Sequence, residues 1–325
     1  MGAVIGLIYH LYTRELGPEM YDRHRMAMAR EREPILAWLV NEILYSWPMD
    51  IFDRFHFIRR WLKRQTFRSR KSHTTYTSSL QIPSFVDFYE INMSDFIQDN
   101  PNAFRNFNDF FIREIRPECR PVAAPDDDAV ITSAADCRLT VFDSLREARR
   151  LYIKGKRFNF SALLGNRVCH GRPDLLHRFT PESSVANFRL HPMDYHRFHA
   201  PVSGKVALME HIPGEYFTVK SKALQSDVNV LCENTRTIVL IESPLNGAVL
   251  FIPIGAEDVG TVTMSIEEGA DIAKGDEIGM FQFGGSDILV VYERAVDWDR
   301  DLAQWSFRGI ETLVRVNERI GTFSR

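Results

Sequence analysis

The stretch from Thr237 to Ile254, TIVLIESPLNGAVLFIPI, holds two apolar runs separated by a segment with Pro244, Asn246 and Gly247. Aliphatic and β-branched residues, which favour strands, dominate both runs. Proline, asparagine and glycine are residues that tight turns prefer. Each run is too short for a typical helix and long enough for a strand. The stretch therefore predicts two neighbouring strands joined by a short turn.

Similar runs recur on both sides of this stretch, from about residue 129 to residue 293. They read AVITSA, RLTVF, GKVALME, YFTVK, VGTVTM and ILVVYE, and Gly and Pro punctuate the sequence between them. Helical patterns interrupt them only in DSLREARRLYI and around residues 161–164, and the tail after residue 303 is mixed. Many short strands with few helices are typical of an antiparallel sandwich or barrel. We expect an α+β protein whose core is a mostly antiparallel β sandwich or barrel, with N-terminal helices.

The first 75 residues have a different pattern, which predicts helices. Within residues 34–71, apolar residues recur at helical spacing, and basic residues crowd the end of the segment. Basic residues beside Trp and Phe suit an anionic membrane surface, but a helical pair packed on the protein explains the pattern as well. The polar stretch 69–79 predicts a linker. We therefore divide the chain into an N-terminal helical segment, residues 1–75, and a second domain, residues 76–325.

Composition excludes several classes of protein. Apolar residues make up 45% and charged residues 26% of the 325, which argues against a disordered chain. Lys+Arg 40 against Asp+Glu 43 gives a net charge of −3, so no nucleic-acid partner is expected. No apolar run reaches the roughly 18 residues that span a bilayer, and the start lacks the basic region of a signal peptide. We expect a protein that is not secreted and is cytoplasmic or peripheral to an endomembrane.

Histidines gather in FRLHPMDYHRFHAPVSG, residues 188–204, where His191, His196 and His199 lie within nine residues together with Asp194. His196 and His199 are an odd number of residues apart, so on an extended chain they point to opposite faces. This spacing argues against a metal site on one strand. Two such histidines can serve two different proton-transfer steps, although a structural, hydrogen-bonded role explains either one singly.

A candidate nucleophile lies in FQFGGSDILVVYE, residues 281–293, where Gly284 and Gly285 precede Ser286 at the start of an apolar run. Paired glycines permit backbone distortion and close approach of another group. A serine becomes a nucleophile where a histidine lies nearby in space, although most such triplets are turns.

Two other motifs flank this chemistry. Asp136, in SAADCR after a strand-like run, is a candidate to orient a histidine as the third member of a triad, or a turn residue. EEGADIAKGDEIGMF, residues 267–281, predicts a tight hairpin between apolar strands. That hairpin would place Ser286 on the next strand.

Taken in order, these motifs resemble the phosphatidylserine decarboxylases, a family of self-cleaving, pyruvoyl-dependent carboxy-lyases made as zymogens. FNDFFIREIRPECRPV, SAADCRLTVF, HPMDYHRFHAPVSGKV and KGDEIGMFQFGGS follow one another within roughly residues 80–295. The combination of DYHRFHAPVSG with KGDEIGMFQFGGS is highly specific. The wording of QIPSFVDFYEINMSDF and ADCR is similar to the fungal, extramitochondrial type.

The resemblance implies self-cleavage between Gly285 and Ser286, into a β chain that ends at residue 285 and an α chain of residues 286–325. Ser286 would become a covalent pyruvoyl group at the start of the α chain. This group would be the cofactor, an electron sink for loss of CO2 from phosphatidylserine to give phosphatidylethanolamine. No metal or external cofactor is implied.

The resemblance also assigns roles to individual side chains. His199 would be the base that activates the serine, and Asp136 would be its orienting acid. His196 would act in the decarboxylation cycle. Asp194 would support the histidines, and Gly284 would allow the backbone distortion that the attack needs.

The sequence departs from the family pattern at two places. Ala135-Asp136-Cys137 stands where many members have Pro-Asp-Gly, but the Asp remains. Asp287 stands where Thr or Ser usually follows the cleavage serine. A carboxylate beside the reacting ester would repel a developing oxyanion, or would instead favour a cationic amine substrate. Three functions therefore stay open. The first is decarboxylation of phosphatidylserine at a membrane surface. The second is decarboxylation of a soluble amino acid in a biosynthetic pathway. The third is that the protein is an uncleaved, non-catalytic relative. Peripheral membrane contact and homo-oligomer formation are also left open.

Overall fold

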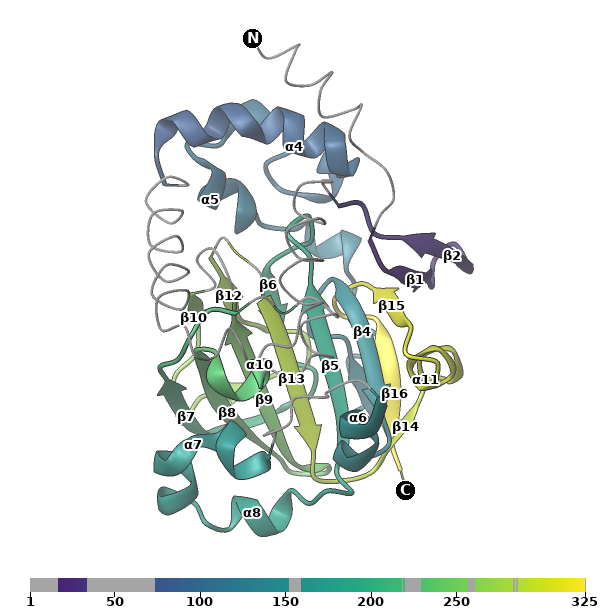
Figure 1. Cartoon of the computed structure of the whole chain (residues 1–325), viewed down its shortest axis with the longest axis vertical. Helices are drawn as coiled ribbons and strands as arrows, with labels where there is room; N and C mark the ends of the chain where they lie inside the picture. Colours follow the sequence, from purple (N-terminus) through teal and green to yellow (C-terminus); the bar gives the residue numbers. More distant parts are fainter. Residues whose placement is uncertain are drawn as a thin grey trace, which may run out of the picture.

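The structure, a computed structural model, is described for residues 17–33, 74–151, 159–217, 219, 229–256, 261–282, 284 and 286–324 (Figure 1). Its centre is a ten-stranded sheet with the order β11-β7-β8-β9-β13-β5-β4-β15-β1-β2. The strands, in that order, are Asp271–Ile272, Gly204–Ile212, Arg236–Ser243, Gly247–Gly255, Ser286–Tyr292, Ser184–Leu190, Cys137–Phe142, Glu311–Val314, Glu19–Asp22 and Ala27–Arg30. Neighbouring strands of this described sheet are antiparallel, except that β1 and β15 are parallel.

The middle strands β9, β13 and β5 are buried along nearly their whole length. Because both faces of these strands are covered, β9 and β13 read as near-continuous apolar runs rather than as alternating patterns. The stretch that predicted two neighbouring strands forms β8 and β9, paired in register from Ser243 opposite Gly247 to Arg236 opposite Ile254. That prediction is confirmed.

Two three-stranded sheets pack on one face of the large sheet. One has the order β10-β12-β6 and the other the order β14-β16-β3. Their strands are Val262–Met264, Glu277–Phe281 and Arg197–His199 in the first, and Val296–Trp298, Arg319–Phe323 and Val130–Thr132 in the second. One buried cluster joins Phe188 and Ile288 of the large sheet to Phe198 and Phe281 of the first small sheet and Ile131 of the second.

The opposite face of the large sheet is covered by short helices (Figure 1). These are α6 (Leu145–Leu151), α7 (Phe160–Gly171), α8 (Leu175–Arg178) and α10 (Val230–Glu233). Leu163, Leu175 and Leu231 pack there against Val185 and Leu289 of the sheet. The helix α11 (Arg300–Phe307) packs beside β4 and β15. The prediction of a mostly antiparallel sandwich in an α+β protein is confirmed, and the core is not a closed barrel.

A helical cap lies over one end of the sheets, at the top of Figure 1. Its helices are η2 (Tyr76–Gln81), α4 (Ile82–Tyr89), η3 (Met93–Asp95), η4 (Pro101–Ala103), α5 (Phe107–Phe111) and η5 (Pro117–Cys119). The side chain of Asn106 accepts the backbone N–H of Asp109 at 2.9 Å and so caps α5. Phe107, Phe110 and Phe111 are all buried, so this five-residue helix is held by its aromatic core contacts.

The prediction of helices in the first 75 residues is wrong for the part that the structure describes. Residues 19–30 form the hairpin β1–β2, and β1 pairs with β15 in the large sheet. Glu31, just after the hairpin, is buried and pairs with both Arg138 and Arg189. Removing one partner of a buried ion pair costs about 3–5 kcal/mol, so these bonds hold the hairpin to the sheet.

Residues 1–16 and 34–73, which include the basic segment 34–71, lie outside the described residues. The domain boundary and the membrane-surface segment therefore stay predictions. Among the described helices, none has both the length and the apolar character needed to span a bilayer.

The predicted tight hairpin in residues 267–281 is also corrected. The turn after β11 leads into β12, but β11 pairs with β7 in the large sheet whereas β12 pairs with β10 and β6 in a small sheet. Gly275 adopts a positive φ of 91° at this turn. The turn therefore passes the chain from one layer of the sandwich to the other.

Candidate active site

Ser286 is the first residue of β13 and lies between Leu190 of β5 and Gly255 of β9. Its side chain is fully buried, and its Oγ lies 3.2 Å from Nδ1 of His196. Gly284, two residues earlier, has a φ of 140°, a conformation that side-chain-bearing residues avoid. Gly285 lies outside the described residues. The structure therefore brings the predicted nucleophile to one of the two predicted histidines.

The hydrogen bonds of His196 fix its tautomer. Its Nε2 lies 3.0 Å from the backbone oxygen of His191, which can only accept, so Nε2 carries the proton. Nδ1 is then unprotonated and accepts from the hydroxyl of Ser286. Burial holds the pKa of His196 well below its ordinary value, and the positive charges of Arg113 and Arg138 act in the same direction. His196 is therefore a neutral acceptor aimed at residue 286.

The end of α5 covers His196. The ring of Phe111 stacks on the imidazole, with centroids 3.8 Å apart and planes 26° apart. The next residue, Ile112, accepts a hydrogen bond of 2.9 Å on its carbonyl from Nε of Arg197. Two successive residues of the cap thus contact two successive residues of the histidine motif.

His199 has different partners. Its Nδ1 lies 2.7 Å from the carbonyl of Gly275 and so carries the proton, while Nε2 accepts from the hydroxyl of Tyr195 at 3.1 Å. Burial lowers the pKa of His199, but the charges of Glu277 and Asp136 oppose this effect. The acidic surroundings favour an imidazolium on His199 more than the surroundings of His196 do.

Among the described residues, the hydrogen bonds of Asp136 go to groups other than His199, so its role as the orienting acid stays a prediction. Its carboxylate accepts from Nε and Nη2 of Arg120 at 3.0 and 2.8 Å, and from the backbone N–H of Val316 at 2.8 Å. The bidentate arginine takes the carboxylate because its fork matches the two oxygens. The carbonyl of Gly275 takes the orienting place on His199, and Asp136 acts on that ring through its charge.

Asp194 supports the histidine motif indirectly. Its carboxylate pairs with Arg138 and accepts the backbone N–H of His191 at 2.7 Å. Burial raises the pKa of Asp194, and Arg138 opposes this shift. Asp194 thus fixes the turn whose carbonyl at His191 sets the tautomer of His196.

Asp287 lies on the opposite face of the sheet from Ser286, because successive side chains of a strand alternate. Its Oδ1 accepts from Nδ2 of Asn187 at 3.1 Å, and no residue in the described part of the chain hydrogen-bonds its buried Oδ2. Burial raises the pKa of Asp287 well above its ordinary value. A carboxyl that faces away and favours its neutral form gives no basis for the predicted repulsion at Ser286.

We predict that Asp287→Asn stabilises the protein increasingly as the pH rises. The folded state raises the pKa of Asp287, so the group's contribution to stability is complete below its unfolded pKa and is lost as the pH rises toward the folded pKa. Between the unfolded and the folded pKa, the difference in free energy of unfolding between the variant and the wild type should grow in favour of the variant by up to about 1.4 kcal/mol per pH unit. Urea titrations from pH 5 to 8 measure this difference in free energy of unfolding. Asp297→Asn, at an exposed strand residue, is the control. A difference that does not grow with pH would refute the prediction.

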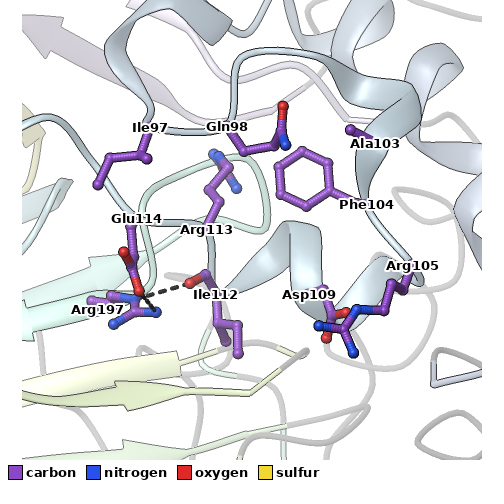
Figure 2. A pocket seen from close by; sticks show the side chains of 10 residues that line it. All are labelled: Ile97, Gln98, Ala103, Phe104, Arg105, Asp109, Ile112, Arg113, Glu114 and Arg197. Carbon is purple, nitrogen blue, oxygen red and sulfur yellow. Dashed lines mark hydrogen bonds and ion pairs between the residues drawn. The ribbon is translucent and has the colours of Figure 1, made fainter.

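An open pocket of about 490 Å³ lies beside the site, between the cap and β6 (Figure 2). It combines arginines, carboxylates and apolar side chains. Its lining residues are Ile97, Gln98, Ala103, Phe104, Arg105, Asp109, Ile112, Arg113, Glu114 and Arg197. Figure 2 shows Arg197 bonded to Glu114 and to the carbonyl of Ile112. Because Ile112 and Arg197 directly follow Phe111 and His196, the pocket adjoins the stacked pair.

Comparison with known proteins shows the family to which the chain is related. The family model described as phosphatidylserine decarboxylase matches residues 107–322. A phosphatidylserine decarboxylase proenzyme 2 from Komagataella phaffii is 38% identical over 303 residues, 92% of this chain and 29% of the relative. A proenzyme 2 from Oryza sativa is 39% identical over 82% of this chain and 42% of its own length. A phosphatidylserine decarboxylase proenzyme from Chlamydia caviae is 32% identical over 89% of this chain and 91% of its own length.

The chain belongs to the phosphatidylserine decarboxylase family, a family of carboxy-lyases, which confirms the resemblance seen in its motifs. It spans less than half the length of the fungal and plant relatives given above, and about nine tenths of the chlamydial one.

Some residues of the site carried no recognisable signal in the sequence. The stack of Phe111 on His196 joins segments about 85 residues apart, and only the density of aromatics in residues 104–115 pointed to a packed element there. Arg120 and Gly275 act through contacts with distant Asp136 and His199, which spacing does not predict.

Proposed function

We propose that the protein is a self-cleaving, pyruvoyl-dependent decarboxylase that converts phosphatidylserine to phosphatidylethanolamine. The observation that carries the proposal is the buried contact of Ser286 with neutral His196, where Ser286 stands two residues after Gly284, a glycine with positive φ. This contact places a proton-transfer group at the residue that would be cleaved and would become the pyruvoyl group. The family of the chain gives this pair its reaction.

Self-cleavage uses atoms of this chain and one water. The hydroxyl oxygen of Ser286 attacks the carbonyl carbon of Gly285, and the amide becomes an ester as the C–N bond breaks. Loss of the Cα proton of residue 286 then expels the carboxylate of Gly285 and leaves a carbon–carbon double bond. Tautomerisation and hydrolysis release ammonia and leave the pyruvoyl group.

The surroundings of residue 286 fit such a group. It would start β13, buried between β5 and β9, with Nδ1 of His196 directed at it. The group supplies a carbonyl that accepts the electron pair left behind when CO2 departs. The chain's own part is to hold that residue, exclude water and move protons.

The two histidines divide these proton transfers in our proposal. His199 serves self-cleavage, because the charges of Asp136 and Glu277 favour the imidazolium that a base becomes. His196 serves decarboxylation, because it contacts residue 286 itself. Its depressed pKa makes its protonated form a strong donor, suited to return a proton to the carbon that has lost CO2.

The pocket beside the site supports a phospholipid rather than a free amino acid as substrate. A pocket of about 490 Å³ exceeds what an amino acid fills, and it places arginines next to Ile97 and Phe104. Arginine recognises phosphate, and the apolar side chains suit the glycerol and acyl portion of a lipid. Peripheral contact with a membrane surface follows from this substrate.

We predict that the purified, cleaved protein releases CO2 from vesicles that contain phosphatidylserine and enriches them in phosphatidylethanolamine. Free L-serine should give no more than one hundredth of that rate, since it lacks the phosphate and glycerol contacts. Mass spectrometry of the extracted lipids measures the conversion, and uncleaved Ser286→Ala protein is the control. Turnover of L-serine with none of the lipid would assign the activity to a soluble amino acid.

A further inference from the structure

The cap contacts the histidine motif at more than one place. Besides the stack of Phe111 on His196, Arg113 donates from Nη2 to the backbone oxygens of Met193 and Asp194 at 2.8 and 3.1 Å. The guanidinium of Arg113 in turn lies 4.6 Å over the ring of Phe110. The end of α5 is therefore rigidly joined to the turn that precedes His196.

Two contacts then define the plane of the imidazole. The bond from Nε2 to the carbonyl of His191 fixes one atom but leaves the ring free to pivot about that bond. The χ2 torsion of histidine has broad minima, so a single hydrogen bond does not set it. The face of Phe111, 3.8 Å away, blocks that pivot and leaves Nδ1 directed at Ser286.

We propose that Phe111 is a positioning residue for the decarboxylation step, which holds the ring of His196 in the orientation that presents Nδ1 to residue 286. This inference rests on the proposed function. It extends that function to a residue of the cap that has no polar group of its own.

The stack also keeps water from His196. Phe111 and His196 are both fully buried, and the charged or titratable groups that face the imidazole are Arg113 from the cap, Arg138 from β4 and His191 from the end of β5. All three oppose protonation, and so does burial. Loss of the ring admits water, weakens the largest of these effects and raises the pKa of His196 toward its ordinary value.

Phe111→Leu and Phe111→Met test the proposal. Both variants keep an apolar side chain but remove the flat ring, and methionine best preserves the volume. Phe107→Leu is the matched control, because Phe107 is buried in the same helix and packs on Phe85 and Phe110. We expect normal self-cleavage in all three. The turnover number on phosphatidylserine vesicles should fall at least tenfold in the Phe111 variants, and the alkaline limb of their pH–rate profile, where His196 loses its proton, should move to higher pH.

A titration of the His196 imidazole by NMR, in uncleaved Ser286→Ala protein, tests the stack of Phe111 on His196 without an activity measurement. The pKa of His196 should rise in the Phe111 variants and stay in place in Phe107→Leu. The proposal is overturned if the Phe111 variants keep the wild-type pH profile and His196 pKa, or if Phe107→Leu changes both equally. Failure of the wild type to cleave or to decarboxylate phosphatidylserine would refute the proposed function. The NMR titration would still test whether the stack of Phe111 sets the pKa of His196.

Discussion

Ser286→Ala protein should remain one chain of 37.6 kDa under conditions in which the wild type separates into two. The small wild-type chain holds the 40 residues from Ser286 to Arg325, about 4.6 kDa by proportion. Alanine has no hydroxyl to attack the preceding carbonyl, so the effect is complete loss rather than slowing. Intact mass spectrometry measures it, and Edman degradation should find the small chain blocked at its N-terminus.

Ser265→Ala, at an exposed serine just after β10, is the control and should separate normally. If the wild-type chain stays whole, the best-supported hypothesis becomes that of an uncleaved, non-catalytic member of the family. Cleavage of Ser286→Ala protein into two chains would show that another residue is the nucleophile. The burial of Ser286 and its bond to His196 make both outcomes unexpected.

The strands that sequence predicted best are those with both faces in apolar cores. β8, β9 and β13 carry uninterrupted aliphatic runs, since each buries side chains on both faces of the large sheet. β5 was missed although it pairs with β13 over its whole length. Its sequence SVANFRL includes Asn187, which hydrogen-bonds Asp287, and Arg189, which pairs with Glu311, so polar residues interrupt its apolar pattern.

The sequence singled out candidate residues for the site but not the contacts between them. Motif order selected Ser286, His196, His199 and Asp136, because each belongs to a segment with an unusual composition. The packing of β6 against β13 decides which histidine contacts the serine. A local sequence pattern does not predict distances between two sheets. The same holds for Asp136, whose partner Arg120 directly follows η5 and lies 16 residues away in the sequence.

The electrostatic difference between the two histidines has a direct kinetic consequence. His199→Asn should slow self-cleavage by about 100-fold or more, the range that general-base catalysis contributes. Asparagine keeps a hydrogen-bonding side chain but cannot take a proton. The charges of Asp136 and Glu277 would then face a neutral amide and stabilise nothing. The measurement is the half-life of the full-length precursor after synthesis.

His196→Asn should cleave at close to the wild-type rate, yet lose about 100-fold of its turnover on phosphatidylserine vesicles. The cations Arg113 and Arg138 and complete burial make His196 a poor place to keep a proton during cleavage, although it contacts the serine. Thermal melting of both precursors controls for unfolding. If His196→Asn instead remains uncleaved while His199→Asn separates, contact outweighs charge at this site, and His196 is the base for cleavage.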